Sequence, residues 1–166
     1  MKIYLIRHSN AVDPGTPGYE EDSLRPLTEK GRDKMDKIAS SLKGLDMKPD
    51  LIVSSPYVRA RQTAEILAKV LKYKKELAFS ETLVPMGNAD EIIGEINEKY
   101  AVDELVLVGH EPCFSGLVSA LTAGNPDLSI NIRKGGVCCL SADDLRAERK
   151  AVLEWLLPPK ILSRLQ

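Results

Sequence analysis

The sequence predicts an α/β fold, a three-layer α/β/α sandwich with a mainly parallel central sheet and an antiparallel edge. Three short apolar runs are each followed by a polar turn and an amphipathic helix, namely Ile3–Ile6, Leu51–Val53 and Leu105–Val108. Strands that alternate with helices pair in parallel, and the helices cover both faces of the sheet. Near the end of the chain, Val137–Leu140 and Ala151–Leu157 flank a charged segment and predict a hairpin that supplies the antiparallel edge.

The composition describes one ordinary domain, spanning residues 1–166. Its 23 basic and 24 acidic residues nearly cancel without a block of like charge, which argues against a nucleic-acid or membrane partner. Three cysteines are too few for a disulfide framework and lack zinc-site spacing, so we expect Cys138 and Cys139 to pack in the core. No stretch has the length of a signal-peptide core or a membrane span. We therefore expect a cytoplasmic protein that needs neither a metal nor another cofactor.

Four helices follow from capping residues and apolar spacing. Thr28 can cap the first helix, and Ser55 with Pro56 can start the second. A third, amphipathic helix follows a weak strand at Ala78–Phe79, and Gly124 ends the fourth. The apolar positions of their buried faces are, in order, Met35, Ile38, Ala39, Leu42 and Leu45; Tyr57, Ala60, Ala64, Leu67, Ala68 and Leu71; Ile92, Ile93, Ile96 and Tyr100; and Phe114, Leu117, Val118 and Leu121.

Two connections and the last strand complete the pattern. Turn residues begin a polar loop over residues 13–27, which we expect to arch over the strand ends. The charged run Asp143–Lys150 predicts a solvated turn inside the hairpin. In the last strand, alternation places three apolar side chains on one face: Leu153, Trp155 and Leu157.

The candidate site is marked by the only two histidines of the chain. Arg7 and His8 directly follow the first strand, and His110 follows the third strand after Gly109. In an open α/β sheet, ligands bind in the crevice beyond the carboxyl ends of the strands. Either histidine taken alone is more typical of a structural residue, but their shared position predicts that the two imidazoles meet in that crevice.

The exit from the second strand contributes further groups to the same crevice. Ser55 ends that strand and is assigned chiefly to capping, whereas Arg59 lies in the first helical turn and off the apolar stripe. Guanidinium groups and helix amino ends bind tetrahedral dianions, so phosphate is the natural occupant. Cations beside an imidazole disfavour its protonated form, which would keep His8 neutral and nucleophilic at pH 7.

Three segments together resemble the signatures of the histidine phosphatase superfamily, whose fold is phosphoglycerate mutase-like: Leu5–His8, Ser54–Ala64 and Val108–His110. Within it, three more segments are similar to the short bacterial phosphohistidine phosphatases of the SixA type: Arg25–Thr28, His110–Pro112 and Trp155–Lys160. The resemblance runs from residue 1 to about residue 162. It therefore covers nearly the whole chain.

The resemblance implies a role for each matching site residue. His8 is the phosphorylated nucleophile, and the phosphoryl oxygens are bound by three residues: Arg7, Arg59 and His110. Arg25, Asn10 and Glu111 are further candidate phosphate contacts. Arg25 can equally be a solvated loop residue, and Glu111 can equally be a partner of the helix dipole.

Two positions depart from the pattern of the superfamily. Ser9 stands where glycine is usual, and a positive φ there would cost on the order of 1 to 3 kcal/mol of strain. Pro85 stands where many relatives carry the general acid, although Glu81 lies nearby and Pro85 can also be a simple turn former. A leaving imidazole, with a reference pKa of about 6.5, needs far less help from an acid than an alkoxide does. The missing acid therefore favours a nitrogen–phosphorus bond as substrate.

These observations predict a phosphohistidine phosphatase that acts on another protein, such as a histidine-containing phosphotransfer domain of a signalling relay. The absence of a large lid insertion agrees with a shallow pocket that admits a protein. One alternative is a small-molecule phosphomonoesterase that uses Glu81 or another acid, and a second is a phosphate-binding regulatory module that Ser9 has made non-catalytic. A metal-dependent hydrolase is disfavoured because two histidines lack a supporting carboxylate cluster.

Overall fold

The computed structural model describes residues 1–125, 128–143, 145 and 151–165. Six strands form one sheet: β1 (Lys2–Arg7), β2 (Leu51–Ser54), β3 (Ala78–Phe79), β4 (Glu104–Gly109), β5 (Val137–Ser141) and β6 (Val152–Leu157). Their spatial order is β3-β2-β4-β1-β5-β6. The first four in that order are parallel, and β5 and β6 are antiparallel, so the mainly parallel sheet with an antiparallel edge is confirmed.

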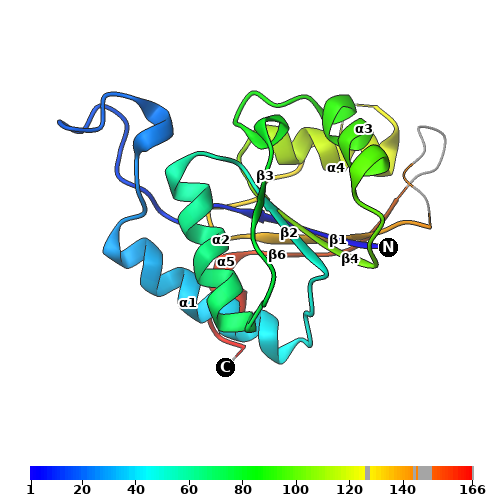
Figure 1. Ribbon diagram of the computed structural model, residues 1–166, viewed down its shortest axis with the longest axis horizontal. Helices are drawn as coiled ribbons and strands as arrows, with labels where there is room; N and C mark the ends of the chain where they lie inside the picture. Colours follow the sequence, from blue (N-terminus) through cyan, green and yellow to red (C-terminus); the bar gives the residue numbers. More distant parts are fainter. Residues whose placement is uncertain (126–127, 144, 146–150, 166) are drawn as a thin grey trace.

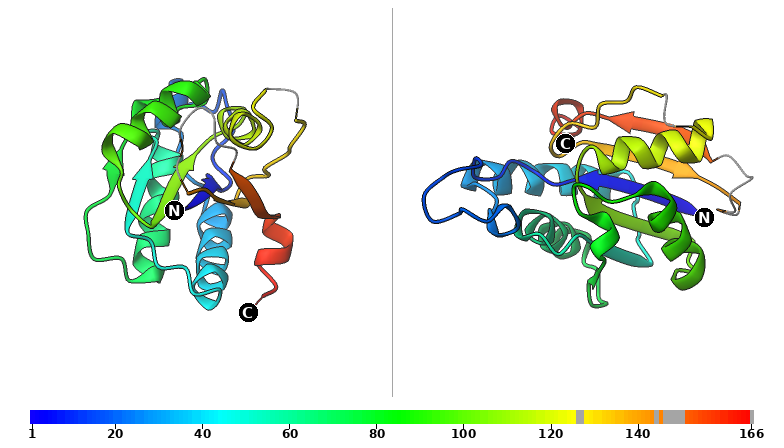
Figure 2. Two further views of the ribbon diagram at one scale, coloured as in Figure 1. Left: turned by 90° about the vertical axis from the view of Figure 1, so that its right-hand side faces the viewer. Right: turned by 90° about the horizontal axis from the view of Figure 1, so that it is seen from above.

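Helices cover both faces of this sheet. The helical elements are α1 (Glu29–Gly44), α2 (Val58–Leu71), α3 (Ala89–Lys99), α4 (Cys113–Ala123) and α5 (Pro159–Leu162), with short 3-10 turns η1 (Asp22–Leu24) and η2 (Glu81–Leu83). Helices α1, α2 and α5 lie on one side of the sheet, and α3 and α4 lie on the other (Figure 1, Figure 2). The predicted three-layer sandwich is therefore confirmed. In the described part of the chain, no helix combines the length and apolar character needed to cross a membrane.

Strand alternation divides the core into two layers. Ile3 and Leu5 of β1 belong to the layer beneath α3 and α4, whereas Tyr4 and Ile6 belong to the layer against α1 and α2. Successive side chains of a strand point to opposite faces, so one strand serves both layers. Cys138 and Cys139 are buried in different layers for the same reason, which confirms that these cysteines are packing residues.

Most of the predicted caps are found where the sequence places them. The Thr28 side chain accepts a hydrogen bond from the Gly31 N–H, and Gly124 ends α4 in the left-handed conformation with φ 70°. Ser55 is a correction, because α2 begins only at Val58 and Tyr57 occupies its N-cap. The Ser55 hydroxyl is thereby released from capping.

Two apolar positions were also wrongly predicted. Leu45 follows the last residue of α1 and is exposed, so the buried stripe of that helix ends at Leu42. The register of β5 with β6 shifts between Cys139 and Leu140, and such a bulge changes the direction of the side chains beside it. Leu153 is accordingly exposed, while Trp155 and Leu157 pack against the layer of α1 and α2. The predicted turn at Asp143–Lys150 lies largely outside the described residues.

The sheet brings three strand exits to one edge. In the parallel register, Arg7 is opposite Gly109, and Ser54 is opposite Val108. Because neighbouring parallel strands end at the same level, the residues that follow them emerge side by side. The loop of residues 13–24 projects beyond this edge and returns to it through η1 (Figure 1).

Candidate active site

The two histidines meet at the carboxyl edge of the sheet, as predicted. The backbone N–H of His8 donates to the Gly109 carbonyl at 3.0 Å, which links the end of β1 to the end of β4. The imidazole centroids of His8 and His110 are 5.0 Å apart. A Cβ on Gly109 would lie 2.8 Å from the Phe114 ring, so the turn into His110 packs too closely for a larger residue. The site is therefore built on the rigid centre of the sheet.

Hydrogen bonds define which nitrogen of His8 can react. His8 Nδ1 lies 2.7 Å from the Ser9 carbonyl oxygen, which can only accept, so Nδ1 carries the proton. The other nitrogen, Nε2, is then unprotonated, and its lone pair accepts a hydrogen bond from Arg59 Nε at 3.3 Å. Only 6 % of His8 is exposed. The ring thus presents an unprotonated, oriented nitrogen to the crevice.

His110 is held by the serine released from capping. The Ser55 hydroxyl lies 2.9 Å from His110 Nε2 and accepts from the Tyr57 N–H at 3.3 Å. When the hydroxyl proton points at Nε2, Nδ1 of His110 carries the ring proton. Nδ1 is buried and has no hydrogen-bond partner among the residues that the structure describes. His110 therefore offers one N–H donor to a ligand.

Arg59 is buried, with 3 % exposed, and is bound by a residue that the sequence analysis missed. Its Nη2 donates to the Asp22 carboxylate at 2.8 Å, and its Nη1 donates to the Asp22 carbonyl at 2.6 Å. Asp22 Oδ1 also accepts from Arg25 Nε at 2.8 Å. The sequence offers one signal, because Asp22 stands three residues before Arg25 in the polar loop. Nothing in that local pattern indicates that Asp22 contacts Arg59.

Arg25 therefore contacts the site indirectly, through Asp22. Arg25 Nη2 also donates to Asp22, and Arg25 Nη1 donates to the Val12 carbonyl at 2.5 Å. Arg25 is buried rather than solvated, which rules out the surface alternative. Its direct contact with phosphate stays a prediction.

Among the described residues, three buried side-chain polar atoms have no partner: Arg7 Nε, His110 Nδ1 and Glu111 Oε1. Arg7 Nη1 is anchored on the Ile132 carbonyl at 2.8 Å, which leaves Nε free for another acceptor. Buried polar groups in native proteins are nearly always paired, so orphaned donors indicate a missing ligand. All three residues are candidates from the sequence, and the two donors suit an oxyanion.

Burial and like charge keep both imidazoles neutral. The pKa of His8 falls to about 3, chiefly because of burial and additionally because of Arg59, Arg7 and Lys134. Burial, aided by His8 and Arg59, lowers the pKa of His110 to about 2. The predicted cations contribute, but burial is the larger cause.

Glu111 and Asn10 have different surroundings. Burial raises the pKa of Glu111 above its ordinary value, although Ser115 and Arg7 act against this. A neutral Glu111 can donate a proton or a hydrogen bond. Asn10 is exposed, and its Oδ1 accepts from Lys34 Nζ at 3.0 Å. Phosphate contacts by Glu111 and Asn10 stay predictions.

Comparison with known proteins places this geometry in a family. A family model described as histidine phosphatase superfamily, branch 1, matches residues 3–84, which include both the Arg7-His8 and the Arg59 segments. The chain belongs to the histidine phosphatase superfamily. This membership identifies it as a phosphatase and confirms the resemblance noted in the sequence.

Two relatives and one structure extend the likeness beyond residue 84. An uncharacterised protein of Picosynechococcus is 33 % identical and covers 95 % of this chain and 100 % of its own. Phosphohistidine phosphatase SixA of Escherichia coli is 27 % identical, over 75 % of this chain and 76 % of that protein. A structure of the protein histidine phosphatase SixA complexed with tungstate has a TM-score of 0.84 at 23 % identity, and covers 98 % of this chain and 99 % of that one.

The two departures from the superfamily pattern have structural answers. Ser9 is absent from the residues with positive φ, so the strain considered for this position does not arise. The Ser9 hydroxyl instead donates to the Gly31 carbonyl at 2.8 Å, and its N–H donates to Thr63 Oγ1 at 3.2 Å. Glu81 is exposed beside a surface cavity along α3. Among the described contacts, none joins Glu81 to the histidines.

Proposed function

We propose that this superfamily member removes phosphate from a phosphohistidine on another protein through a phosphoenzyme intermediate at His8. The observation that carries the proposal is the unprotonated Nε2 of His8, which lies in one cluster with two buried donors that lack acceptors among the described residues. These two donors are Arg7 Nε and His110 Nδ1. The Arg59 guanidinium, which contacts His8, is a third donor group. Together they provide a nucleophile and a set of donors for three phosphoryl oxygens.

The reaction has two in-line steps. In the first, His8 Nε2 forms a bond to phosphorus while the bond between phosphorus and the substrate nitrogen breaks, leaving its electron pair on that nitrogen. In the second, a water oxygen bonds to phosphorus, the electron pair of the phosphorus–nitrogen bond returns to Nε2, and one water proton passes to a phosphate oxygen. The Ser9 carbonyl holds the Nδ1 proton of His8 throughout, so His8 leaves as a neutral imidazole. The role of Arg7, Arg59 and His110 is to stabilise the equatorial oxygens.

The leaving group favours a phosphohistidine substrate. Pro85 cannot protonate an alkoxide, and Glu81 makes no described contact with the cluster. A protonated imidazole leaves without a strong acid. The likeness to SixA supports the same substrate class, and the tungstate in the SixA structure is a tetrahedral oxyanion like phosphate. A histidine phosphotransfer domain is the partner class that we expect.

One observation favours a second candidate, a phosphomonoesterase for small substrates. Glu111 directly follows His110, its pKa is raised by burial, and its Oε1 is buried without a partner. A neutral carboxyl group in this place can protonate an alkoxide. Glu111→Gln should then abolish turnover of alkyl phosphates while leaving that of phosphohistidine.

Trapping of the intermediate tests the proposal. Brief reaction with a ³²P-labelled phosphohistidine protein should leave acid-labile, alkali-stable phosphate on His8, and His8→Asn should carry no label. The catalytic efficiency on phosphohistidine should exceed that on sugar phosphates, and a chelator should leave both unchanged. Higher efficiency on the esters would favour the phosphomonoesterase. A wild-type enzyme that binds phosphate but never becomes labelled would be a regulatory module.

A further inference from the structure

Asp22 occupies an unusual position for a carboxylate at a site that binds an anion. It is clamped by Arg59 and Arg25, and its side chain is 51 % exposed. Oδ1 accepts two hydrogen bonds from Arg25, whereas Oδ2 accepts one, from Arg59 Nη2. A carboxylate oxygen has two lone pairs. Oδ2 therefore keeps one acceptor position for a donor that arrives from solvent.

The Arg59 guanidinium relates Asp22 to the reacting atoms. Its Nε donates to His8 Nε2, whereas each of its two terminal nitrogens donates one of its two N–H groups to Asp22. The Arg59 guanidinium thus lies between Asp22 and His8, and the half-exposed Asp22 side chain is open to solvent. In an in-line transfer the leaving group departs on the side of phosphorus opposite the nucleophile. A solvent-exposed acceptor beyond Arg59 can therefore meet an imidazole that approaches from solvent and departs in that direction.

Transfer of a phosphoryl group between two imidazoles has the same protonation requirement for both rings. Each ring can leave phosphorus as a neutral imidazole only if its other nitrogen carries a proton, since otherwise it would leave as imidazolate. For His8 this proton is held by the Ser9 carbonyl at 2.7 Å. The substrate ring needs an equivalent acceptor, and that acceptor has to lie outside the phosphate pocket.

We propose that Asp22 is the leaving-group subsite of this enzyme, where Oδ2 accepts the N–H of the phosphorylated imidazole and holds that ring in its protonated form. This inference rests on the proposed function. When the phosphorus–nitrogen bond breaks, its electron pair stays on the substrate nitrogen. The proton remains on the other nitrogen, so a neutral imidazole departs. Asp22 thereby selects a phosphorylated imidazole over an ester, whose leaving oxygen has no second N–H to offer.

The charges around Asp22 keep it ionised for this role. Burial works to raise the pKa of Asp22, but the hydrogen bonds and positive charges of Arg25 and Arg59 outweigh it, so the pKa lies below its ordinary value. The His110 ring, which is neutral, also lies within electrostatic range of Asp22. The Tyr57 ring packs on Arg59, with 5.0 Å between its centroid and Arg59 Cζ. An ionised carboxylate next to a substrate imidazole favours the imidazolium form.

The competing role for Asp22 is purely structural, as a clamp that positions Arg59. Loss of a clamp weakens the binding of every phosphoryl group alike. Loss of a leaving-group acceptor affects only a substrate whose leaving group has an N–H. The two roles therefore separate in the ratio of two substrates.

The experiment compares Asp22→Asn with the wild type on a phosphohistidine protein and on p-nitrophenyl phosphate. We expect kcat/KM for phosphohistidine to fall about 10- to 100-fold more than that for the aryl ester, the range for loss of a hydrogen bond to a charged group. Glu21→Gln is the matched control, because Glu21 is an exposed neighbour whose carboxylate accepts only from Ser23 in the described contacts. It should leave the ratio unchanged.

The pH dependence of kcat on phosphohistidine supplies a second readout that needs no variant. With Asp22 ionised, the bound substrate imidazole should stay protonated above its ordinary pKa of about 6.5. The decrease in kcat on the alkaline side should therefore occur at a pH above this value. A fall that starts at the pKa of the free substrate overturns the proposal, as do equal losses on the two substrates in Asp22→Asn. A wild type that turns over p-nitrophenyl phosphate but not phosphohistidine overturns the proposed function itself.

Discussion

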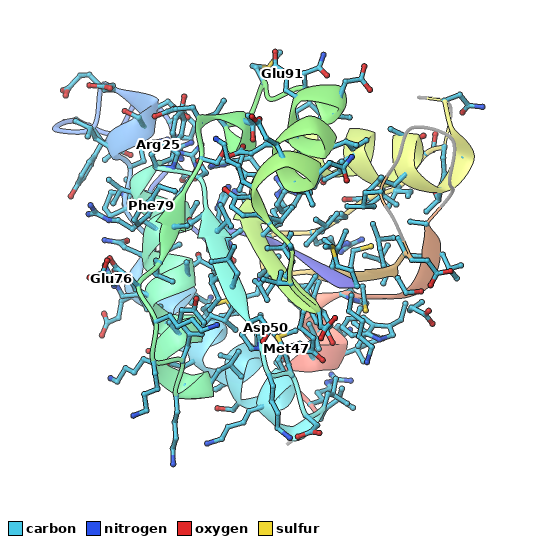
Figure 3. All side chains as sticks on the ribbon, turned by 45° about the vertical axis from the view of Figure 1, so that its right-hand side comes forward. Arg25, Met47, Asp50, Glu76, Phe79 and Glu91 are labelled. Carbon is cyan, nitrogen blue, oxygen red and sulfur yellow. The ribbon has the colours of Figure 1, made fainter. Side chains whose placement is uncertain are left out.

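The two ends of the central sheet differ in whether their polar groups have hydrogen-bond partners. At the amino end, the Asp50 carboxylate accepts the N–H groups of Asp103 and Glu104 at 3.2 and 3.0 Å, and Lys75 Nζ donates to the Asp50 carbonyl at 2.7 Å. At the carboxyl end, Arg7 Nε and His110 Nδ1 are buried without acceptors. Arg25 and Asp50, labelled in Figure 3, mark the two ends.

A surface cavity does not by itself mark the site. A cavity of about 420 Å³ opens at the amino end, lined by residues that include Asp50, Lys75 and Asp103. Asp50, Lys75 Nζ and the Asp103 N–H find partners within the protein, so these groups stabilise the fold. The carboxyl end leaves its donors unpaired at a cost to the fold, which is typical of a site that waits for a ligand. The predictions below test this division.

The largest effect is expected from Arg59→Met at the carboxyl end. Loss of the guanidinium removes transition-state stabilisation and should lower kcat/KM about 1,000-fold, equivalent to about 4 kcal/mol. Arg61→Met is the matched control, because Arg61 is exposed on the same helix and pairs only with Glu65, at 3.5 Å, in the described contacts. Steady-state kinetics would refute the assignment if both variants lost activity equally.

Acid should destabilise the protein through the two histidines. Their folded-state pKa values, about 3 for His8 and about 2 for His110, lie below the unfolded value of about 6.5, so between these limits only the unfolded state takes up protons. Stability is complete above pH 6.5 and should fall by about 2 kcal/mol per histidine at pH 5. Urea unfolding at both pH values measures this loss.

The double variant His8→Asn/His110→Asn isolates that contribution from those of the carboxylates. Its stability should fall about 3 kcal/mol less than the wild-type stability between pH 6.5 and 5. Parallel pH profiles for the two proteins would mean that the imidazoles are charged in the folded state.

At the amino end, Asp50→Ala should cost stability and leave catalysis intact. Two backbone N–H groups lose their acceptor, which should lower the free energy of unfolding by about 1 to 3 kcal/mol. Glu76→Ala, which removes an exposed carboxylate ahead of β3, should change it by less than about 0.5 kcal/mol. A drop in turnover per folded Asp50→Ala molecule would contradict the division between the two ends.

The smallest effect is expected at Ser9, between the nucleophile and α1. Because Ser9 has no positive φ, glycine relieves no strain there and only removes the hydroxyl bond to the Gly31 carbonyl. Ser9→Gly should cost about 1 kcal/mol of stability and change kcat less than about twofold. A clear gain in activity would restore the view that serine impairs this site.

The comparison also explains which expectations were correct. The parallel strands, the flanking helices and the meeting of His8 with His110 follow from local patterns, because strand exits in a parallel sheet share one edge. The capping role of Ser55 was wrong because α2 begins at Val58, and the hydroxyl binds His110 instead. Leu153 was misplaced because a bulge is a property of two paired strands and leaves no trace in one.

By itself, the sequence determined the α/β architecture, and it predicted the four site residues Arg7, His8, Arg59 and His110, which the structure brings to one edge of the sheet. Periodicity and spacing act over a few residues, so these features can be read along the chain. Only the tertiary structure decided that burial keeps the imidazoles neutral and that Asp22 clamps Arg59 from 37 residues away. Desolvation and long-range hydrogen bonds depend on what surrounds a group in space, and a linear sequence does not specify those surroundings.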